Sequence, residues 1–185
     1  KDGLHFIFVG NWIPRKGLHT LLIALHDLQS YEWQLSLVGR TNLQPSYEKR
    51  IRRLIESGGL SHRVRIYGAV SDDELVKTWQ SADVLVVPSQ YEGFGIVYLE
   101  AMRFGVIPVA GQDGAAGEII ESVVNGFLVP PDSPAALKKV QLELLSNADL
   151  RVALKKAARN RYEQFPTWQE SMATVRRFLI ENFLR

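Results

Sequence analysis

The sequence contains no cysteine, and this absence removes disulfide bonds, thiolate nucleophiles, zinc fingers and iron–sulfur clusters from its chemistry. Histidine is scarce, and the four that occur, at positions 5, 19, 26 and 62, form no cluster with metal-ligand spacing. His19 and His26 lie two turns apart on one predicted helix, where they are expected to pack or to face solvent. Asp72 and Asp73 fit the first turn of a helix better than a metal site. We therefore expect no metal ion and no other cofactor.

Long apolar runs are also missing. No stretch reaches the roughly 18 apolar residues of a membrane-spanning helix, and the opening KDGLHFIFVG lacks the segments of a signal peptide. No charge of one sign dominates, because the sequence has 22 Lys and Arg and 20 Asp and Glu, for a formal charge of +2. So small a net charge gives no reason to expect a nucleic-acid partner. We expect a cytoplasmic protein. An apolar strand begins almost at Lys1, so we also expect a piece excised from a longer chain.

The residues that are present fit one α/β domain spanning residues 1–185. At this length, with 46% hydrophobic residues, a chain buries about 70% of its unfolded surface, which is enough for a core. Apolar runs rich in β-branched and aromatic residues alternate with segments of helical period. The predicted strands are residues 6–9, 35–38, 64–67, 84–87, 106–109 and 127–129. This alternation predicts a Rossmann-like, doubly wound parallel sheet of about six strands with helices on both faces.

Two helices between these strands have clear local signals. Leucines recur at three- and four-residue steps from Leu18 to Leu28 and mark one face of a helix. Ser71 and Glu74 form a capping box that opens a second, shorter helix. The side chains expected to face the core from this second helix are Leu75, Val76 and Trp79.

After Val129 the chain has only helical patterns. Three prolines interrupt it before the apolar spacing of a helix resumes at Leu137. The sequence therefore predicts a helical C-terminal segment. In its last helix, Trp168 and Met172 are four residues apart and are expected to serve in packing and not as a ligand site, although the last helix of this fold can cross to a partner domain.

Two loops of the predicted sheet, residues 10–17 and 88–95, combine glycine with charge. Both follow strands, and ligands of open parallel sheets bind where strands end and helices begin. Neither loop is a known nucleotide fingerprint. The third glycine of the dinucleotide motif is missing after Gly95, and residues 10–16 do not match the phosphate loop of nucleoside triphosphatases.

The second loop combines glycines at a helix start with a glutamate, and a further glutamate follows in the helix. Gly93 and Gly95 bracket a helix start, where unpaired amides and the positive end of the dipole favour phosphate. Glu92 precedes these glycines, and Glu100 lies about a turn inside the helix. A carboxylate accepts hydrogen bonds from hydroxyls, often two from one vicinal diol. A phosphate flanked by two diols describes a sugar nucleotide.

The first loop offers cations that complement this chemistry. Arg15 and Lys16 precede Gly17 at the start of the leucine-striped helix, where they would offset the charge of a diphosphate. Lys16 is the preferred ligand. A basic pair is more commonly just solvated, and the first loop by itself leaves that alternative open.

The run from Glu92 to Met102, EGFGIVYLEAM, resembles the E-x7-E signature of family-four retaining glycosyltransferases, which have the two-domain GT-B fold. Both glutamates, both glycines and the Glu-Ala-Met that ends the run agree with the signature at once. Further matches extend over nearly the whole chain, at residues 8–10, 16–17, 37–39, 81–83, 88–89, 117–119 and 125–130. The resemblance covers the carboxyl-terminal, donor-binding domain of the family.

The resemblance implies roles for single residues. Lys16 matches the diphosphate lysine, Glu92 matches the glutamate that approaches the transferred sugar, and Glu100 matches the ribose glutamate. Two backbone segments would also contact the donor. These are Gly93, Phe94, Gly95 and Ile96 at the sugar and phosphate, and Ala69 and Val70 at the nucleobase.

One position departs from the family pattern. The family usually has an arginine directly after the first-strand glycine, where this sequence has Asn11. Part of the phosphate clamp is therefore in question. Arg15 either substitutes for the missing arginine or points away, and the sequence leaves both open.

The reaction that the resemblance implies is transfer of a sugar from a nucleotide-diphosphate sugar to an acceptor hydroxyl, with retention of anomeric configuration. Lys16 would stabilise the leaving diphosphate, and Glu92 would position the sugar. The family takes a histidine near the sugar, and most acceptor contacts, from an amino-terminal acceptor domain that is absent here. We therefore expect the isolated chain to be inactive.

Three partners are expected: the nucleotide sugar, the missing amino-terminal domain, and membrane lipid or a lipid-linked acceptor touched peripherally at the cytoplasmic face. The basic residues considered for the membrane are Arg52, Arg53, Arg176 and Arg177, for which solvation is the simpler alternative. Two other functions stay open. A GT-B-like nucleotide-sugar epimerase would share the fold without the full signature, and a non-catalytic nucleotide-sugar-binding module would bind the donor without turnover.

Overall fold

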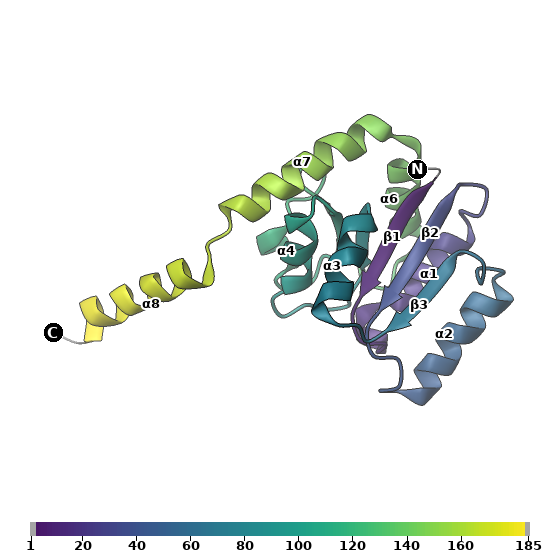
Figure 1. Cartoon of the computed structure of the whole chain (residues 1–185), viewed down its shortest axis with the longest axis horizontal. Coiled ribbons are helices and arrows are strands. Elements are labelled where there is room, and N and C mark those ends of the chain that lie inside the picture. The colour runs from purple at the N-terminus through teal and green to yellow at the C-terminus, as the bar shows by residue number, and fades with distance from the viewer. Residues whose placement is uncertain (1–2, 184–185) are drawn as a thin grey trace.

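The structure, a computed structural model, describes residues 3–183 and has one six-stranded sheet at its centre (Figure 1). The strands are β1 (Leu4–Val9), β2 (Trp33–Val38), β3 (Val64–Gly68), β4 (Val84–Val87), β5 (Ile107–Gly111) and β6 (Phe127–Val129). All pair in parallel, in the order β3-β2-β1-β4-β5-β6. The strand order reverses between the neighbours β1 and β4, and such a switch point is where open α/β sheets bind ligands.

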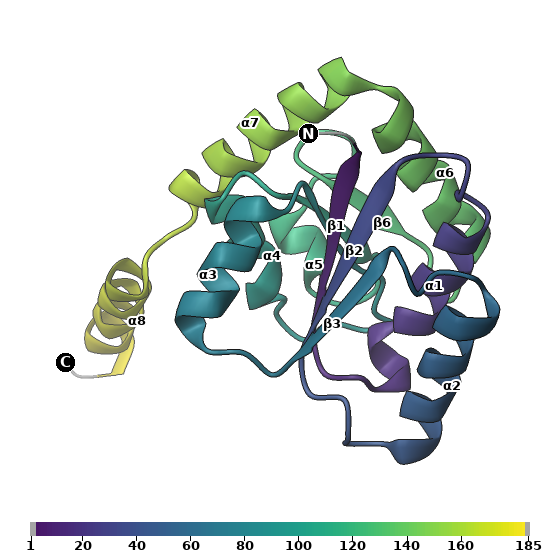
Figure 2. The same ribbon diagram turned by 45° about the vertical axis from the view of Figure 1, so that its right-hand side comes forward.

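Helices cover both faces of the sheet (Figure 2). On one face, α1 (Leu18–His26) packs beside α2 (Pro45–Ser57) and α6 (Pro134–Ser146). The other face carries α3 (Asp72–Ser81) and α4 (Ile96–Arg103), and α7 (Ala148–Gln164) packs against α4 and β5. A single turn, α5 (Ala116–Ile119), follows β5, and a short 3-10 helix (Pro14–Lys16) precedes α1. The predicted fold class is confirmed.

The core forms because the central strands are apolar on both sides. Phe6, Ile7 and Phe8 of β1 have no exposed surface, although consecutive strand residues point to opposite faces. The four residues of β4 are equally buried. Both faces of the sheet are therefore covered, as the absence of polar alternation in these runs predicts.

The predicted strands agree with the observed ones apart from their ends. β5 runs over Ile107–Gly111 instead of 106–109, because the amide of Val106 donates to the carbonyl of Ala101 at 3.0 Å and still belongs to the turn that leaves α4. The capping box of Ser71 and Glu74 is confirmed. The expectation that Val76 faces the core is wrong, because Val76 is 39% exposed while Trp79 lies on the buried face of α3.

The last helix, α8 (Trp168–Phe183), extends away from the domain (Figure 1). The expectation that Trp168 and Met172 pack is wrong for the part of the chain that the structure describes, since they are 79% and 44% exposed. The backbone explains the departure. Phe165 ends α7 in an extended conformation, and Pro166, which lacks an amide hydrogen, follows it. The chain therefore leaves the domain before α8 begins.

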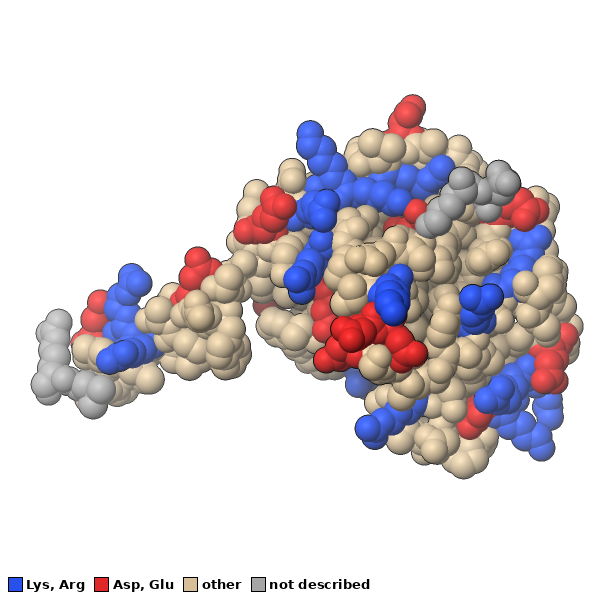
Figure 3. All heavy atoms as spheres, viewed as in Figure 1, with Lys and Arg blue, Asp and Glu red and all other residues tan. Residues whose placement is uncertain are grey.

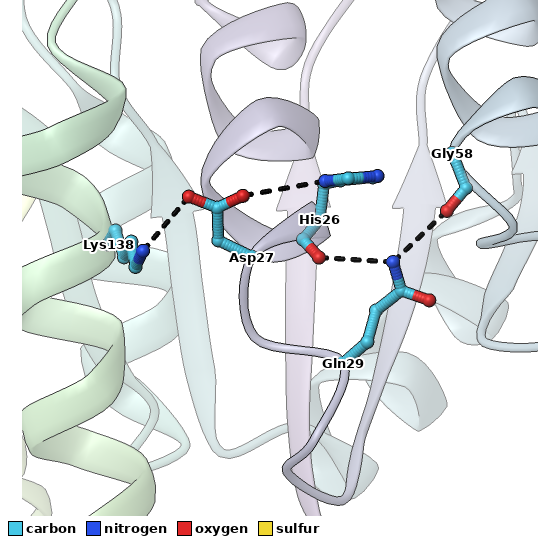
Figure 4. A network of polar contacts seen from close by, with 5 residues as sticks. All are labelled: His26, Asp27, Gln29, Gly58 and Lys138. Atoms are coloured by element: carbon cyan, nitrogen blue, oxygen red, sulfur yellow. Dashed lines mark hydrogen bonds and ion pairs between the residues drawn. The ribbon is translucent and has the colours of Figure 1, made fainter.

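The carboxyl end of α1 is tied to two neighbouring helices by polar contacts (Figure 4). Lys138 of α6 donates to Asp27 at 2.9 Å, and the same carboxylate lies 3.5 Å from the ring of His26. The amide of Gln29 donates to the carbonyls of His26 and Gly58, the latter at the end of α2. These contacts link the carboxyl end of α1 to its neighbours, and the loop of residues 10–17 leads into the amino end of α1.

Candidate functional site

The switch point brings residues 10–17 and 88–95 together, because β1 and β4 are neighbours in the sheet. The amide of Gln90 donates to the carbonyl of Arg15 at 2.8 Å. Gly17 has a φ of 70°, and a Cβ there would collide with the carbonyl of Pro88. Only glycine permits so close an approach. The two loops that the sequence singled out therefore form one site.

Lys16 and Glu92 meet at the centre of this site, although 76 residues separate them in sequence. The ammonium Nζ of Lys16 donates to Oε2 of Glu92 at 2.6 Å, and the side chains are only 15% and 12% exposed. The hydroxyl of Ser89 donates to the same carboxylate oxygen at 3.2 Å. A cation and a carboxylate thus lie side by side at the carboxyl ends of β1 and β4.

Arg15 is exposed, and its guanidinium donates to the carbonyl of Tyr91. The side chain therefore points toward the 88–95 loop and does not extend freely into solvent. This contact also holds the two loops together. Asn11, at the position where the family has an arginine, is exposed.

The glycines before α4 have different requirements. Gly95 is the N-cap residue, with a φ of 87°, and a Cβ on it would lie 2.6 Å from the ring of Tyr98. A Cβ on Gly93 would have nothing within 4 Å. Phe94 and Ile96 are 54% and 63% exposed. Gly93 is therefore open to a ligand, and the amides at the start of α4 favour an anion.

Glu100 lies one turn inside α4 and is partly buried. Burial, with a smaller contribution from the charge of Asp72, raises the pKa of its carboxyl group. Figure 3 shows acidic atoms gathered over the start of α3, where Asp72, Asp73 and Glu74 form the first turn. Within residues 3–183 no hydrogen bond or ion pair engages the Glu100 carboxylate. Its acceptor capacity is thus open to a ligand.

Ala69 and Val70 follow β3 at the same edge of the sheet. The carbonyl of Gly68 accepts from the amide of Gly39 at 2.7 Å, and a Cβ on Gly39 would collide with the carbonyl of Gly10. The ends of β1, β2 and β3 are thus closely apposed. Ala69 is exposed and Val70 partly buried, at one side of the loops that carry Lys16 and Glu92.

Sequence reasoning missed the loop after β5. The amide of Glu92 donates to the carbonyl of Asp113, and its carbonyl accepts from Ala115 at 2.8 Å. Gly114 has a φ of 89°, and a Cβ on it would collide with the carbonyl of Glu92. The glycine itself was the available signal, since it follows a strand and marks a close backbone approach.

A second missed group lies beside Lys16 on the amino end of α1. The ring of His19 lies 2.9 Å from the hydroxyl of Tyr47 and 3.7 Å from the carboxylate of Asp132. The carboxylate of Asp132 also accepts from the side-chain amide of Gln90 at 2.7 Å. Burial lowers the pKa of His19, with the charge of Arg50 acting in the same direction and Asp132 opposing it. No local pattern links residues so distant in sequence.

The described residues hold no group of three or more His, Cys, Asp or Glu side chains arranged to bind a metal ion. They also include no helix with the length and apolar composition needed to cross a bilayer.

The comparison with known families identifies the class. Residues 1–161 match the model of the family described as glycosyl transferases group 1, and the chain belongs to this family. The Rossmann-like domain is thus that of a glycosyltransferase of the GT-B type, as the resemblance predicts.

Individual relatives agree. An uncharacterized glycosyltransferase of Methanocaldococcus jannaschii is 32% identical over 92% of this chain and 46% of its own length. Among solved structures, sucrose-phosphate synthase from Thermosynechococcus elongatus superposes with a TM-score of 0.87 at 31% identity, over 97% of this chain and 46% of that one. HepE from Anabaena, in complex with UDP-glucose, superposes with a TM-score of 0.83 at 25% identity, over 97% and 48%. The chain spans less than half the length of these relatives.

Proposed function

We propose that this chain is the donor-binding half of a retaining glycosyltransferase that uses a nucleotide-diphosphate sugar. The observation that carries the proposal is the meeting of Lys16 and Glu92 at the switch point, beside the open backbone at Gly93. Glu100 adds a partly buried carboxylate without a protein partner, one turn further along α4. The complex of HepE with UDP-glucose supports a sugar nucleotide as the ligand.

In the proposed complex the diphosphate lies against the first turn of α4 and takes the ammonium of Lys16 as its counter-charge. The ribose diol donates to Glu100, whose unpaired carboxylate otherwise has its charge disfavoured by burial. The transferred sugar lies over Gly93, where its hydroxyls reach Glu92. Ala69 and Val70 contact the nucleobase through their backbone.

In the proposed reaction, the bond between the anomeric carbon and the diphosphate oxygen breaks while the acceptor oxygen bonds to that carbon on the same face. The acceptor's proton passes to the departing phosphate oxygen. Lys16 and the amides of α4 stabilise the leaving charge, and Glu92 positions the sugar as positive charge builds on it. Both substrates must be held together for this step, so an acceptor domain outside this chain is part of the proposal.

The exposed apolar side of α8, with Trp168 and Phe183 at 79% and 70% exposure, is available to such a domain. We place the reaction in the cytoplasm. Of the arginines considered for membrane contact, Arg52 pairs with Glu48 at 2.8 Å on α2.

Calorimetry and an activity assay test the proposal together. The purified chain should bind at least one of UDP, GDP and ADP, with the affinity unchanged after chelation by EDTA, because Lys16 supplies the counter-charge. It should transfer no sugar from the matching nucleotide sugar to simple acceptors. Absence of nucleotide binding, or binding that disappears with EDTA, contradicts the proposed site. Transfer or epimerisation by the chain alone contradicts the half-enzyme role.

A further inference from the structure

We infer that the carboxylate of Glu92 pairs with the ammonium of Lys16 whenever the site lacks a sugar. This ion pair weakens binding of the nucleoside diphosphate product relative to the nucleotide sugar, and so promotes product release. This inference rests on the proposed function, because it assigns the diphosphate to Lys16. It starts from the 2.6 Å contact between Nζ of Lys16 and Oε2 of Glu92, two groups that the reaction assigns to different parts of the donor.

The pair is sheltered enough to compete with a ligand. The side chains are 15% and 12% exposed, so water screens their attraction less than it screens a surface pair. The hydroxyl of Ser89, itself 1% exposed, donates to the same oxygen and holds the carboxylate in this position. A diphosphate that takes the ammonium of Lys16 therefore has to displace a pre-organised carboxylate.

Only side chains need to move in this exchange. The backbone of Glu92 is fixed on both sides, by Asp113 at its amide and Ala115 at its carbonyl. The amide of Lys16 donates to Ile13 at 3.1 Å, and Gly17 follows in a left-handed turn against Pro88. The side chain of Glu92 is thus the part that must move, and the space beside Gly93 is open to it, because a Cβ on Gly93 would meet nothing within 4 Å.

The charge balance then depends on the sugar. With an intact donor, Lys16 pairs with the diphosphate, and the sugar hydroxyls over Gly93 satisfy Glu92. After transfer the sugar is gone, and Glu92 is left unpaired beside the negative diphosphate. A partly buried charge without a partner is unfavourable, so its return to Lys16 opposes the bound product. The empty site, in which the two charges neutralise each other, is the end point of that return.

Glu92→Gln is the test, because it keeps the shape of the side chain and removes its charge. In calorimetry on the 185-residue chain, affinity for UDP should rise about three- to tenfold, a range suited to removing one partly sheltered competing charge. Affinity for UDP-glucose should stay level or fall, because the sugar loses an acceptor. GDP with GDP-mannose replaces this pair if the chain prefers guanine. Glu163→Gln, on the exposed part of α7, removes one negative charge elsewhere and should change neither affinity.

The Lys16→Met background separates competition from simple repulsion. If Glu92 acts by occupying Lys16, Glu92→Gln should no longer raise UDP affinity when Lys16 is absent. A gain that persists in full in that background overturns the inference, as does equal or weaker UDP binding by the single variant Glu92→Gln while the wild-type chain binds UDP. A wild-type chain that binds no nucleoside diphosphate overturns the proposed function, and this inference with it.

Discussion

Glu100→Gln should weaken donor binding while making the free domain more stable. The carboxylate is partly buried, no described residue hydrogen-bonds to it, and burial together with Asp72 raises its pKa. The folded protein therefore disfavours the negative charge of Glu100, which is the charge that would accept hydrogen bonds from the ribose. Replacing the carboxylate by a neutral amide keeps the shape and removes this penalty. Function and stability change in opposite directions only if Glu100 is a ligand-binding group.

The binding loss follows from the change of a charge-assisted acceptor into a neutral one. Two hydrogen bonds from a ribose diol would weaken, at a cost of about 1–3 kcal/mol, or about 5- to 150-fold in affinity. The nucleoside diphosphate and the nucleotide sugar should lose affinity equally, because both contain the ribose. Calorimetric titration of UDP and UDP-glucose measures both losses.

The stability gain has a defined pH window. A carboxyl group with a raised pKa contributes stability below its ordinary value of 4.5 and loses this contribution as the pH rises through the folded value. At pH 7 the variant should therefore be more stable than the wild type, by less than about 1 kcal/mol, or less than about 4 °C in Tm. The gap should close below pH 4.5. A variant that is less stable at pH 7, or that keeps full UDP affinity, refutes this account of Glu100.

Three further outcomes are expected. Gly95→Ala should lower Tm, because the residue has a φ of 87° and its Cβ would lie 2.6 Å from Tyr98. Gly93→Ala should keep Tm and weaken UDP-glucose binding. Similar Tm losses in both variants would show that Gly93 is structural. Tyr98→Phe should reduce the free energy of unfolding by about 1 kcal/mol in urea titrations, because it deletes the buried hydroxyl that donates to Val87 at 3.2 Å, and an unchanged value would argue against that bond. The free energy of unfolding should fall as the pH drops below 6.5, because the folded state resists protonation of His19 while the unfolded chain accepts the proton. His19→Gln should show a shallower decline of stability with pH. Identical slopes for the variant and the wild type would exclude His19 as the cause.

Most of the fold could be predicted from the sequence, because the signals for its strands and helices are local. Runs such as residues 6–9 and 84–87 are apolar throughout, and only a buried parallel strand fits them. The capping box at Ser71 needs only residues three apart. Local signals also explain the errors. The period of α3 admits both Val76 and Trp79 to an apolar face, and only the packed sheet decides which is buried.

The predicted site residues lie at one edge of the sheet, yet sequence reasoning did not find their mutual contacts. Nothing near Lys16 indicates that its ammonium meets a carboxylate 76 positions away, because that contact depends on the strand order. The same holds for Arg15, whose orientation toward Tyr91 was one of two open alternatives. The apolar face of α8 has the same period whether its partner lies in this chain or elsewhere, and therefore Trp168 was misplaced.

An NMR titration of the 15N-labelled chain with UDP-glucose, or with GDP-mannose if guanine is preferred, would locate the donor directly. The amides that shift should lie in residues 10–17, 68–70 and 88–100, where the loops of the switch point meet. Saturating shifts confined to another surface would contradict the proposed donor site. One such surface is the hollow between α5 and α7 that Gly117, Asn160 and Arg161 line.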